Sequence, residues 1–255
     1  MNKVEKLKLL SLSKADAEAD IKLINQYSMK ELTPEEVFVF SVILCDNEVD
    51  RDLERFTNES LEALAPLFIG KAGISDHDWT MDRQIARLYR TEVVDTGEIN
   101  SLGEPKKVLR GDAYMLRLRN DRMVAAIEGG IIKEVSVGCA IGGASCSICG
   151  APMRWGGCGD GHEKGQEYDG KLCYADLNNP KDAYEFSFVA VPAQRGAGVT
   201  KSAKDLDGLY DDLMAADISA LGEDKIKSLI TKGQAALLSE EERKKRAEII
   251  AKYKI

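Results

Sequence analysis

The sequence predicts an α+β protein with a mostly antiparallel β-barrel core and flanking helices. Short runs of β-branched and aromatic residues, such as Val37–Cys45, recur through the first two thirds of the chain. Few helical segments separate these runs, which favours antiparallel strands over βαβ units. A cysteine-rich insertion and a charged C-terminal stretch interrupt the pattern. We therefore expect an N-terminal helical segment at 1–36, a main domain at 37–200 and a helical charged tail at 201–255.

The first elements follow from local patterns. Residues 1–36 combine many charges with spaced leucines and are expected to be helical. Thr33-Pro34-Glu35-Glu36 is typical of a helix start, with Thr at the N-cap, Pro at the first position and Glu at the third. The run Val37–Cys45 fits the helix that this start would begin, but its β-branched residues equally fit a strand. Asp46–Asp50 is predicted to be a turn and Thr57–Leu67 a short amphipathic helix.

The later elements alternate between strands and one helix. Two consecutive glycines close the predicted helix as C-terminal caps, and a proline stops the last strand. The predicted strands are Ile85–Val94, Val108–Leu118, Ile132–Ile141 and Tyr184–Val191, and the predicted helix is Asn120–Glu128.

Composition limits the function classes. With 44% hydrophobic and 31% charged residues, the 255-residue chain is expected to be globular and not disordered. No apolar run approaches the roughly 20 residues of a membrane span, and the charged N-terminus predicts no secretory signal. A net charge of −8 argues against a broad nucleic-acid-binding surface.

Five of the six cysteines lie within residues 139–173, which predicts a metal site. The segments C146-S-I-C149 and C158-G-D-G-H162 have the C-x2-C and C-x3-H spacings of metal ligands. Thiolates with one imidazole suit Zn²⁺, so the predicted ligands are the four residues Cys146, Cys149, Cys158 and His162. Cys173 is an alternative to one of them, and Cys139 is a weaker candidate. Four protein ligands leave no open position, which makes a structural zinc the expectation.

Other interpretations of this insertion are weaker. Disulfides are disfavoured without a secretory signal. His162 begins H-E-K-G-Q, where Gln166 replaces the second His of the H-E-x-x-H zinc-protease motif. Three basic and four acidic side chains between Cys139 and Cys173 make a poor footprint for phosphate. Cys45, alone in an apolar run, is expected to be a core residue.

Two predicted strands carry residues suited to catalysis. Alternation places Ser136 opposite an apolar face, and in the later strand it places Glu185 and Ser187 on one face. His77 lies in a polar loop, so the chain offers His, Ser and Glu in that order. A serine nucleophile requires an adjacent base and an acid that orients the base. No G-x-S-x-G elbow surrounds Ser136, which excludes an α/β-hydrolase.

In these segments the sequence resembles the tailed-phage prohead proteases, the serine proteases of capsid maturation, which are related in fold to the herpesvirus assemblins. The matching segments are I74-S-D-H77-D-W, K133-E-V-S136-V-G-C and Y184-E-F-S-F-V-A-V-P192-A193, preceded by D46-N-E-V-D-R-D. Their order and spacing carry the resemblance, which covers roughly residues 37–200.

The resemblance implies a Ser-His-acid endopeptidase on a β-barrel. Ser136 matches the nucleophile, His77 the general base and Glu185 the orienting residue, a position that the assemblins fill with His. Asp182 and Asp176 are the alternatives to Glu185. The predicted zinc knuckle departs from the simplest family members and is expected near the substrate groove.

The resemblance also implies the substrates and the place of action. These are the scaffold protein, the N-terminal region of the major capsid protein and the protease itself, cut inside the procapsid in the host cytoplasm. No nucleic-acid or membrane partner is expected, and a homo-oligomer is left open. The main alternative is a non-catalytic, zinc-stabilised structural or interaction protein of the capsid. A nucleic-acid-binding zinc protein is disfavoured by the local charge.

Overall fold

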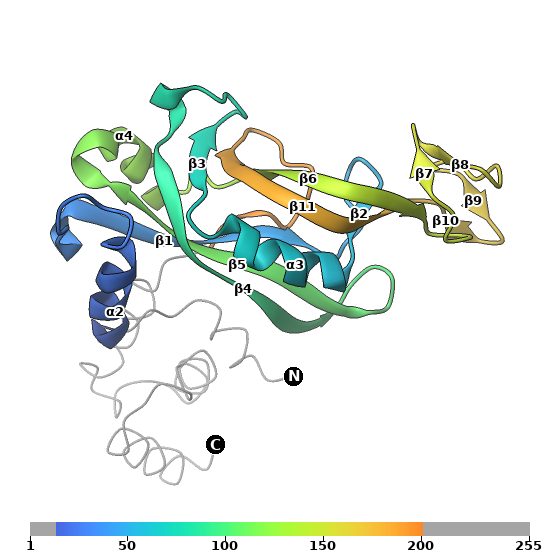
Figure 1. Cartoon of the computed structure of the whole chain (residues 1–255), viewed down its shortest axis with the longest axis horizontal. Helices are drawn as coiled ribbons and strands as arrows, with labels where there is room; N and C mark the ends of the chain where they lie inside the picture. The colour runs from blue at the N-terminus through green and yellow to red at the C-terminus, as the bar shows by residue number, and fades with distance from the viewer. Residues whose placement is uncertain (1–13, 201–255) are drawn as a thin grey trace, which may run out of the picture. The chain divides into compact units, whose positions relative to one another are not determined.

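The computed structural model describes residues 14–200, so the predicted tail 201–255 and the first part of the predicted N-terminal segment lie outside the described residues. Within this range the chain is α+β, as predicted, with a sheet core flanked by helices (Figure 1). The main strands are β1 Val37–Asp46, β2 Glu54–Phe56, β3 Ala72–Ser75, β4 Ala86–Ile99, β5 Pro105–Leu116, β6 Val135–Cys146, β11 Ala175–Phe188 and β12 Gly198–Val199. The helices are α2 Lys14–Ile24, α3 Asn58–Phe68 and α4 Arg117–Glu128, with single 3-10 turns at η1 Pro34–Glu36 and η2 Met81–Arg83.

The large sheet is open. Its strands follow the order β12-β1-β5-β4-β3-β11-β2, and β6 pairs with β11. An isolated bridge between Glu134 and Gly198 joins the residue before β6 to β12, but no continuous ladder closes the circle. The sheet core is therefore confirmed, whereas the predicted barrel is not.

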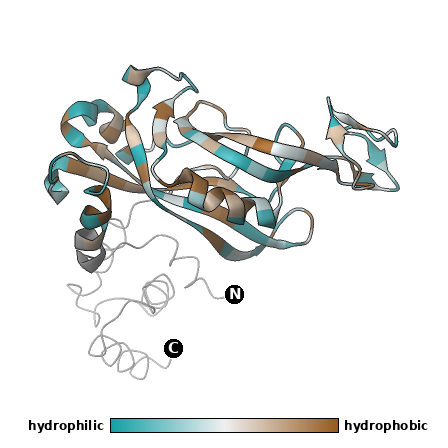
Figure 2. Ribbon diagram, viewed as in Figure 1, coloured by the Kyte–Doolittle hydropathy of each residue, from teal (hydrophilic) through white to brown (hydrophobic). Residues whose placement is uncertain are grey.

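Strand β1 is mostly apolar and is buried on both of its faces, so it lies in the core of the sheet. Eight of its ten residues are buried, and Figure 2 shows hydrophobic residues along β1 and α3. The Thr57 side chain accepts a hydrogen bond from the Ser60 amide and caps α3, which buries Leu61 and Leu64. The predicted helix at Thr57–Leu67 is thus confirmed, with a boundary shift of one residue.

The N-terminal segment is less helical than predicted. In its described part, α2 ends at Ile24 and helical structure returns only as the single turn η1. The Thr33 amide donates to the Glu36 carboxylate, as the predicted helix start requires. However, the β-branched and aromatic run that follows is recruited into β1, because pairing with β5 buries these side chains.

The ribbon formed by β6 and β11 is longer than predicted. The cysteine-rich insertion, predicted at 139–173, therefore begins later in the chain. The predicted strands Ile132–Ile141 and Tyr184–Val191 are replaced by β6 and β11, which pair from Val135↔Phe188 to Cys146↔Ala175. Cys139 therefore lies inside the ladder, and the insertion begins at Cys146. Cross-strand backbone bonds extend the ribbon through a segment whose small side chains give little alternation signal.

Residues 146–173, which we call the Cys/His module, join the far ends of β6 and β11. The module holds four two-residue strands: β7 Met153–Arg154, β8 Gly157–Cys158, β9 Glu167–Tyr168 and β10 Lys171–Leu172. Its apolar cluster is small: the buried residues Cys146, Met153 and Cys173 pack with Ala175, the first residue of β11. Among residues 14–200, no helix has the length and apolar character to cross a membrane.

Candidate active site and metal centre

Three neighbouring strands carry the predicted catalytic residues (Figure 1). β11 lies in the middle, with β3 parallel on one side and β6 antiparallel on the other. His77 follows the end of β3, Glu185 is on β11 and Ser136 is on β6. Pairing thus brings together three residues from distant parts of the sequence.

The register turns Ser136 and Glu185 to the same face. Ser136 pairs with Ser187, and Gly138 pairs with Glu185. Directly opposed residues of antiparallel strands share a face. Tyr184 forms a bulge between the pairs Ala183↔Cys139 and Glu185↔Gly138, and this bulge determines which residues of β11 lie opposite those of β6.

His77 and Glu185 form the central contact. The Nδ1 atom of His77 lies 2.8 Å from Oε1 of Glu185. Glu185 is 4% exposed, whereas the His77 side chain is 43% exposed. An ionised carboxylate only accepts hydrogen bonds, so with Glu185 ionised this contact would require the proton of a neutral imidazole on Nδ1 and would leave Nε2 as the acceptor.

Ser136 and His77 both line a cleft of about 680 Å³. Gly138 and Glu185 line the same cleft, together with an acidic wall formed by Asp50, Asp52 and Glu54. A partly exposed imidazole and a serine hydroxyl in one cleft, with a buried carboxylate in contact with the imidazole, have the composition of a nucleophile, base and orienting acid.

The alternative carboxylates are engaged elsewhere. Asp182 accepts from the Lys71 ammonium at 3.1 Å. Asp176 accepts from the Arg55 guanidinium at 2.6 Å. Among the described residues, Glu185 is the carboxylate that contacts His77.

Sequence reasoning missed the part that Ser187 has in this arrangement. Its side chain is fully buried, and its hydroxyl donates to Oε2 of Glu185 at 2.6 Å. It also accepts from the backbone amide of His77 at 3.1 Å. The only available signal was the spacing of two between Glu185 and Ser187, which gave a shared face but no partner.

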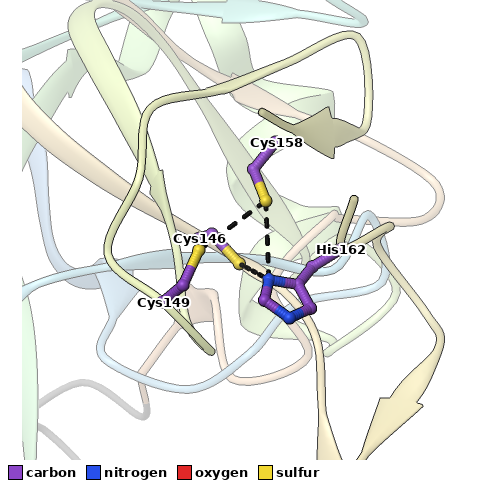
Figure 3. A group of neighbouring side chains, drawn as sticks. All are labelled: Cys146, Cys149, Cys158 and His162. Atoms are coloured by element: carbon purple, nitrogen blue, oxygen red, sulfur yellow. Dashed lines mark hydrogen bonds between the residues drawn. The ribbon is translucent and has the colours of Figure 1, made fainter. Parts of the chain in front are cut away.

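The predicted metal ligands converge in the Cys/His module (Figure 3). Nδ1 of His162 lies 3.5 Å from Sγ of Cys158 and 3.8 Å from Sγ of Cys146. Sγ of Cys149 lies 3.7 Å from Sγ of Cys158. All four donor atoms lie within 4.8 Å of one another, so the four residues are able to hold a metal ion.

Backbone amides lower the pKa of two of these thiols and so favour the thiolate form. Burial opposes ionisation of Cys146, but hydrogen bonds from the amides of Cys149 and Ile148 lower its pKa below the ordinary value. For Cys158, burial is likewise outweighed by the amides of His162 and Asp160, and the pKa is lowered. Amides directed at sulfur stabilise the thiolate, which is the form that binds metal.

The other cysteines lie outside the group of four. Sγ of Cys173 is 3.8 Å from Sγ of Cys146, but Cys173 is not among the donors that all lie within 4.8 Å of one another. On β6, burial and then the charge of Glu185 raise the pKa of Cys139 to about 11. Cys45 is buried in the core, as expected, and burial raises its pKa well above the ordinary value.

No protein-family model matches the chain, and no curated protein is significantly similar to it.

Proposed function

We propose that the chain is a serine endopeptidase in which Ser136 is the nucleophile, His77 the general base and Glu185 the orienting acid. The observation that supports this most directly is the 2.8 Å contact between His77 and the buried Glu185, at a cleft that Ser136 also lines. A neutral His with Nδ1 protonated leaves Nε2 free to take the proton of a serine hydroxyl.

The proposed reaction has two stages. Oγ of Ser136 attacks the peptide carbonyl while Nε2 of His77 accepts the hydroxyl proton, and Glu185 stabilises the imidazolium that forms. His77 then gives this proton to the leaving amine, and an acyl-enzyme ester remains on Ser136. His77 then accepts a proton from water as the water attacks the ester, and it returns this proton to Oγ of Ser136 as the bond between Oγ and the acyl carbon breaks and the new carboxyl group leaves.

The resemblance to the prohead proteases supports a particular class of substrate. On that basis the chain cleaves the scaffold protein and the N-terminal region of the major capsid protein inside the procapsid, and it cleaves itself. The herpesvirus-like barrel belongs to the same proposal. Its support in the fold is the Glu134–Gly198 bridge between the two ends of the sheet.

We further propose that the ion of the Cys/His module is Zn²⁺ and that it is structural. Three thiolates and one imidazole are a soft donor set suited to zinc, and four protein ligands leave no position for water. Bound zinc would supply cross-linking of the module and no step of the cleavage reaction.

The test compares Ser136→Ala with Ser145→Ala, a serine on the same strand that accepts from Asn178 and does not line the cleft. Each variant and the wild type are co-expressed with scaffold and capsid protein, and cleavage is read by mass spectrometry. A fluorophosphonate probe, which labels activated serines whatever the substrate, is applied in parallel.

We expect cleavage and labelling in the wild type and in Ser145→Ala. In Ser136→Ala we expect no labelling and a loss of cleavage of at least about 10³-fold. Undiminished cleavage in Ser136→Ala would overturn the assignment of the nucleophile. A wild type that neither cleaves nor takes the label would favour the alternative, a zinc-stabilised structural protein of the capsid.

A further inference from the structure

We propose that Ser187 is a positioning residue that fixes both the acid and the base of the site, and therefore sets the tautomer of His77. This inference deepens the proposed function and rests on it for its catalytic consequence. Its structural part, the tautomer, depends only on the contacts among Ser187, Glu185 and His77.

The Ser187 hydroxyl has a single proton to donate, and its acceptor is Glu185. Oγ donates it to Oε2 of Glu185 at 2.6 Å, and Oγ accepts from the His77 amide at 3.1 Å. The bond between Ser187 and Glu185 is buried, so water does not compete for it, and the bond from the His77 amide is partly buried. Oε2 is thereby held by Ser187, and Oε1 is the oxygen that faces Nδ1 of His77.

The backbone of His77 needs this support. Asp76 and His77 have φ values of 55° and 53°, so two consecutive non-glycine residues adopt the left-handed conformation. This conformation is unfavourable for any residue that carries a Cβ. Two hydrogen bonds to β11 hold the turn: the Asp76 amide donates to the Phe188 carbonyl at 2.9 Å, and the His77 amide donates to Ser187.

These contacts also give different roles to Ser136 and Ser187, which are directly paired between β6 and β11. Ser187 is fully buried and its proton is committed to Glu185, so it does not serve as a nucleophile. Ser136, partly exposed and lining the cleft, has the accessible hydroxyl. One serine reacts, and the other holds the groups that activate it.

The experiment uses the full chain labelled with ¹⁵N-histidine. The chain contains two histidines, and the signal of His162 is identified by its disappearance in His162→Ala. Spectra are recorded at about pH 8, where an ordinary imidazole is neutral. The variants are Ser187→Ala, Ser187→Thr, which keeps the hydroxyl, and Ser187→Cys, which keeps the size with a weaker donor.

The matched control is Ser41→Ala. Ser41 is also a buried strand serine that donates to a buried carboxylate at 2.6 Å, that of Asp112, and it does not line the cleft. A general effect of losing a buried hydroxyl will appear in this control, whereas an effect on the His77 tautomer will not.

We expect the wild type and Ser41→Ala to show His77 protonated at Nδ1. Ser187→Ala should give a mixture of tautomers, with kcat about 10²-fold lower and KM unchanged. Ser187→Thr should restore the pure tautomer. Should the alanine variant fail to fold, Ser187→Cys is expected to show the same change in smaller degree.

A pure Nδ1-protonated His77 in both Ser187→Ala and Ser187→Cys would overturn the positioning role. The spectra require no turnover, so the two proposals fail separately. If the wild type is inactive but Ser187→Ala changes the tautomer, the positioning role is supported and the proteolytic function is not.

Discussion

The Cys/His module and the candidate catalytic cleft are built from side chains at very different sequence separations. Cys146 and His162 are 16 residues apart, whereas His77 and Glu185 are 108 residues apart. The module's donors lie at the ends of β6 and β8 and in or after the turns that follow these strands, so they need little surrounding structure. The cleft's residues are brought together by three strands of the main sheet, beside the largest apolar cluster.

This difference predicts separate sources of stability. The cleft is stabilised by the main apolar core, because Phe186 and Phe188, on either side of Ser187 in β11, are buried in that core. The module has only three buried residues of its own, Cys146, Met153 and Cys173, so we expect its stability to depend on the proposed metal ion. The two regions should respond independently to metal removal and to substitutions in the cleft.

Metal removal should have the largest effect, confined to the module. Cys149 is an exposed ligand, so Cys149→Ser removes a metal donor without burying a new polar group. We expect bound zinc to fall from about one equivalent to less than about half, because the remaining donors no longer close the coordination shell. Hydrogen exchange should show lost amide protection in 146–173, while β1 and β5 keep theirs.

Cys139→Ser is the control, since Cys139 lies in the ladder outside the group of four donors. It should bind zinc like the wild type. Full protection of the module after chelation would contradict the assignment of a structural metal.

Glu185→Gln should have the next largest effect, confined to the cleft. A glutamine amide is able to donate toward Nδ1 of His77 and so favour the wrong tautomer. We expect kcat to fall about 10³- to 10⁴-fold, with bound zinc unchanged. Steady-state kinetics and metal analysis of the same preparation check both statements.

Asp182→Asn is the matched change on the same strand. Its carboxylate pairs with Lys71 and is half exposed, so activity should stay within about twofold of the wild type. The reverse ranking, with Asp182→Asn more damaging, would transfer the orienting role to Asp182.

Gly138→Ala should have the smallest effect of the three. A Cβ at Gly138 would lie 2.4 Å from Oε1 of Glu185, so the carboxylate must move away from His77. We expect a loss of about 10²-fold in kcat and about 1–3 kcal/mol in the free energy of unfolding. Kinetics and urea denaturation measure the two quantities.

Gly143→Ala, on the same strand, is the control, because a Cβ there would have no neighbour within 4 Å. Activity and stability should match the wild type. An equal loss in both alanine variants would mean that the strand requires glycine itself, and not that the carboxylate requires the space at Gly138.

The sequence was informative where a pattern is local. The spacing of Cys146, Cys149, Cys158 and His162 predicted the cluster that the structure contains. Alternation along β11 correctly placed Glu185 and Ser187 on one face. The helix start at Thr33 was recognised, yet its helix lasts one turn, because pairing of the next residues with β5 outweighs a local signal.

The sequence alone determined the chemistry available to this protein: four soft donors at metal-ligand spacing, one histidine left for proton transfer, and a serine and a glutamate on strands. Tertiary structure decided which carboxylate meets His77, because the sequence offered Glu185 with Asp176 and Asp182 as alternatives, and their positions along β11 and their partners distinguish them. It also decided the contacts of Ser187. A hydroxyl becomes a positioning group only when burial removes water and long-range pairing supplies the carboxylate and the amide that replace it.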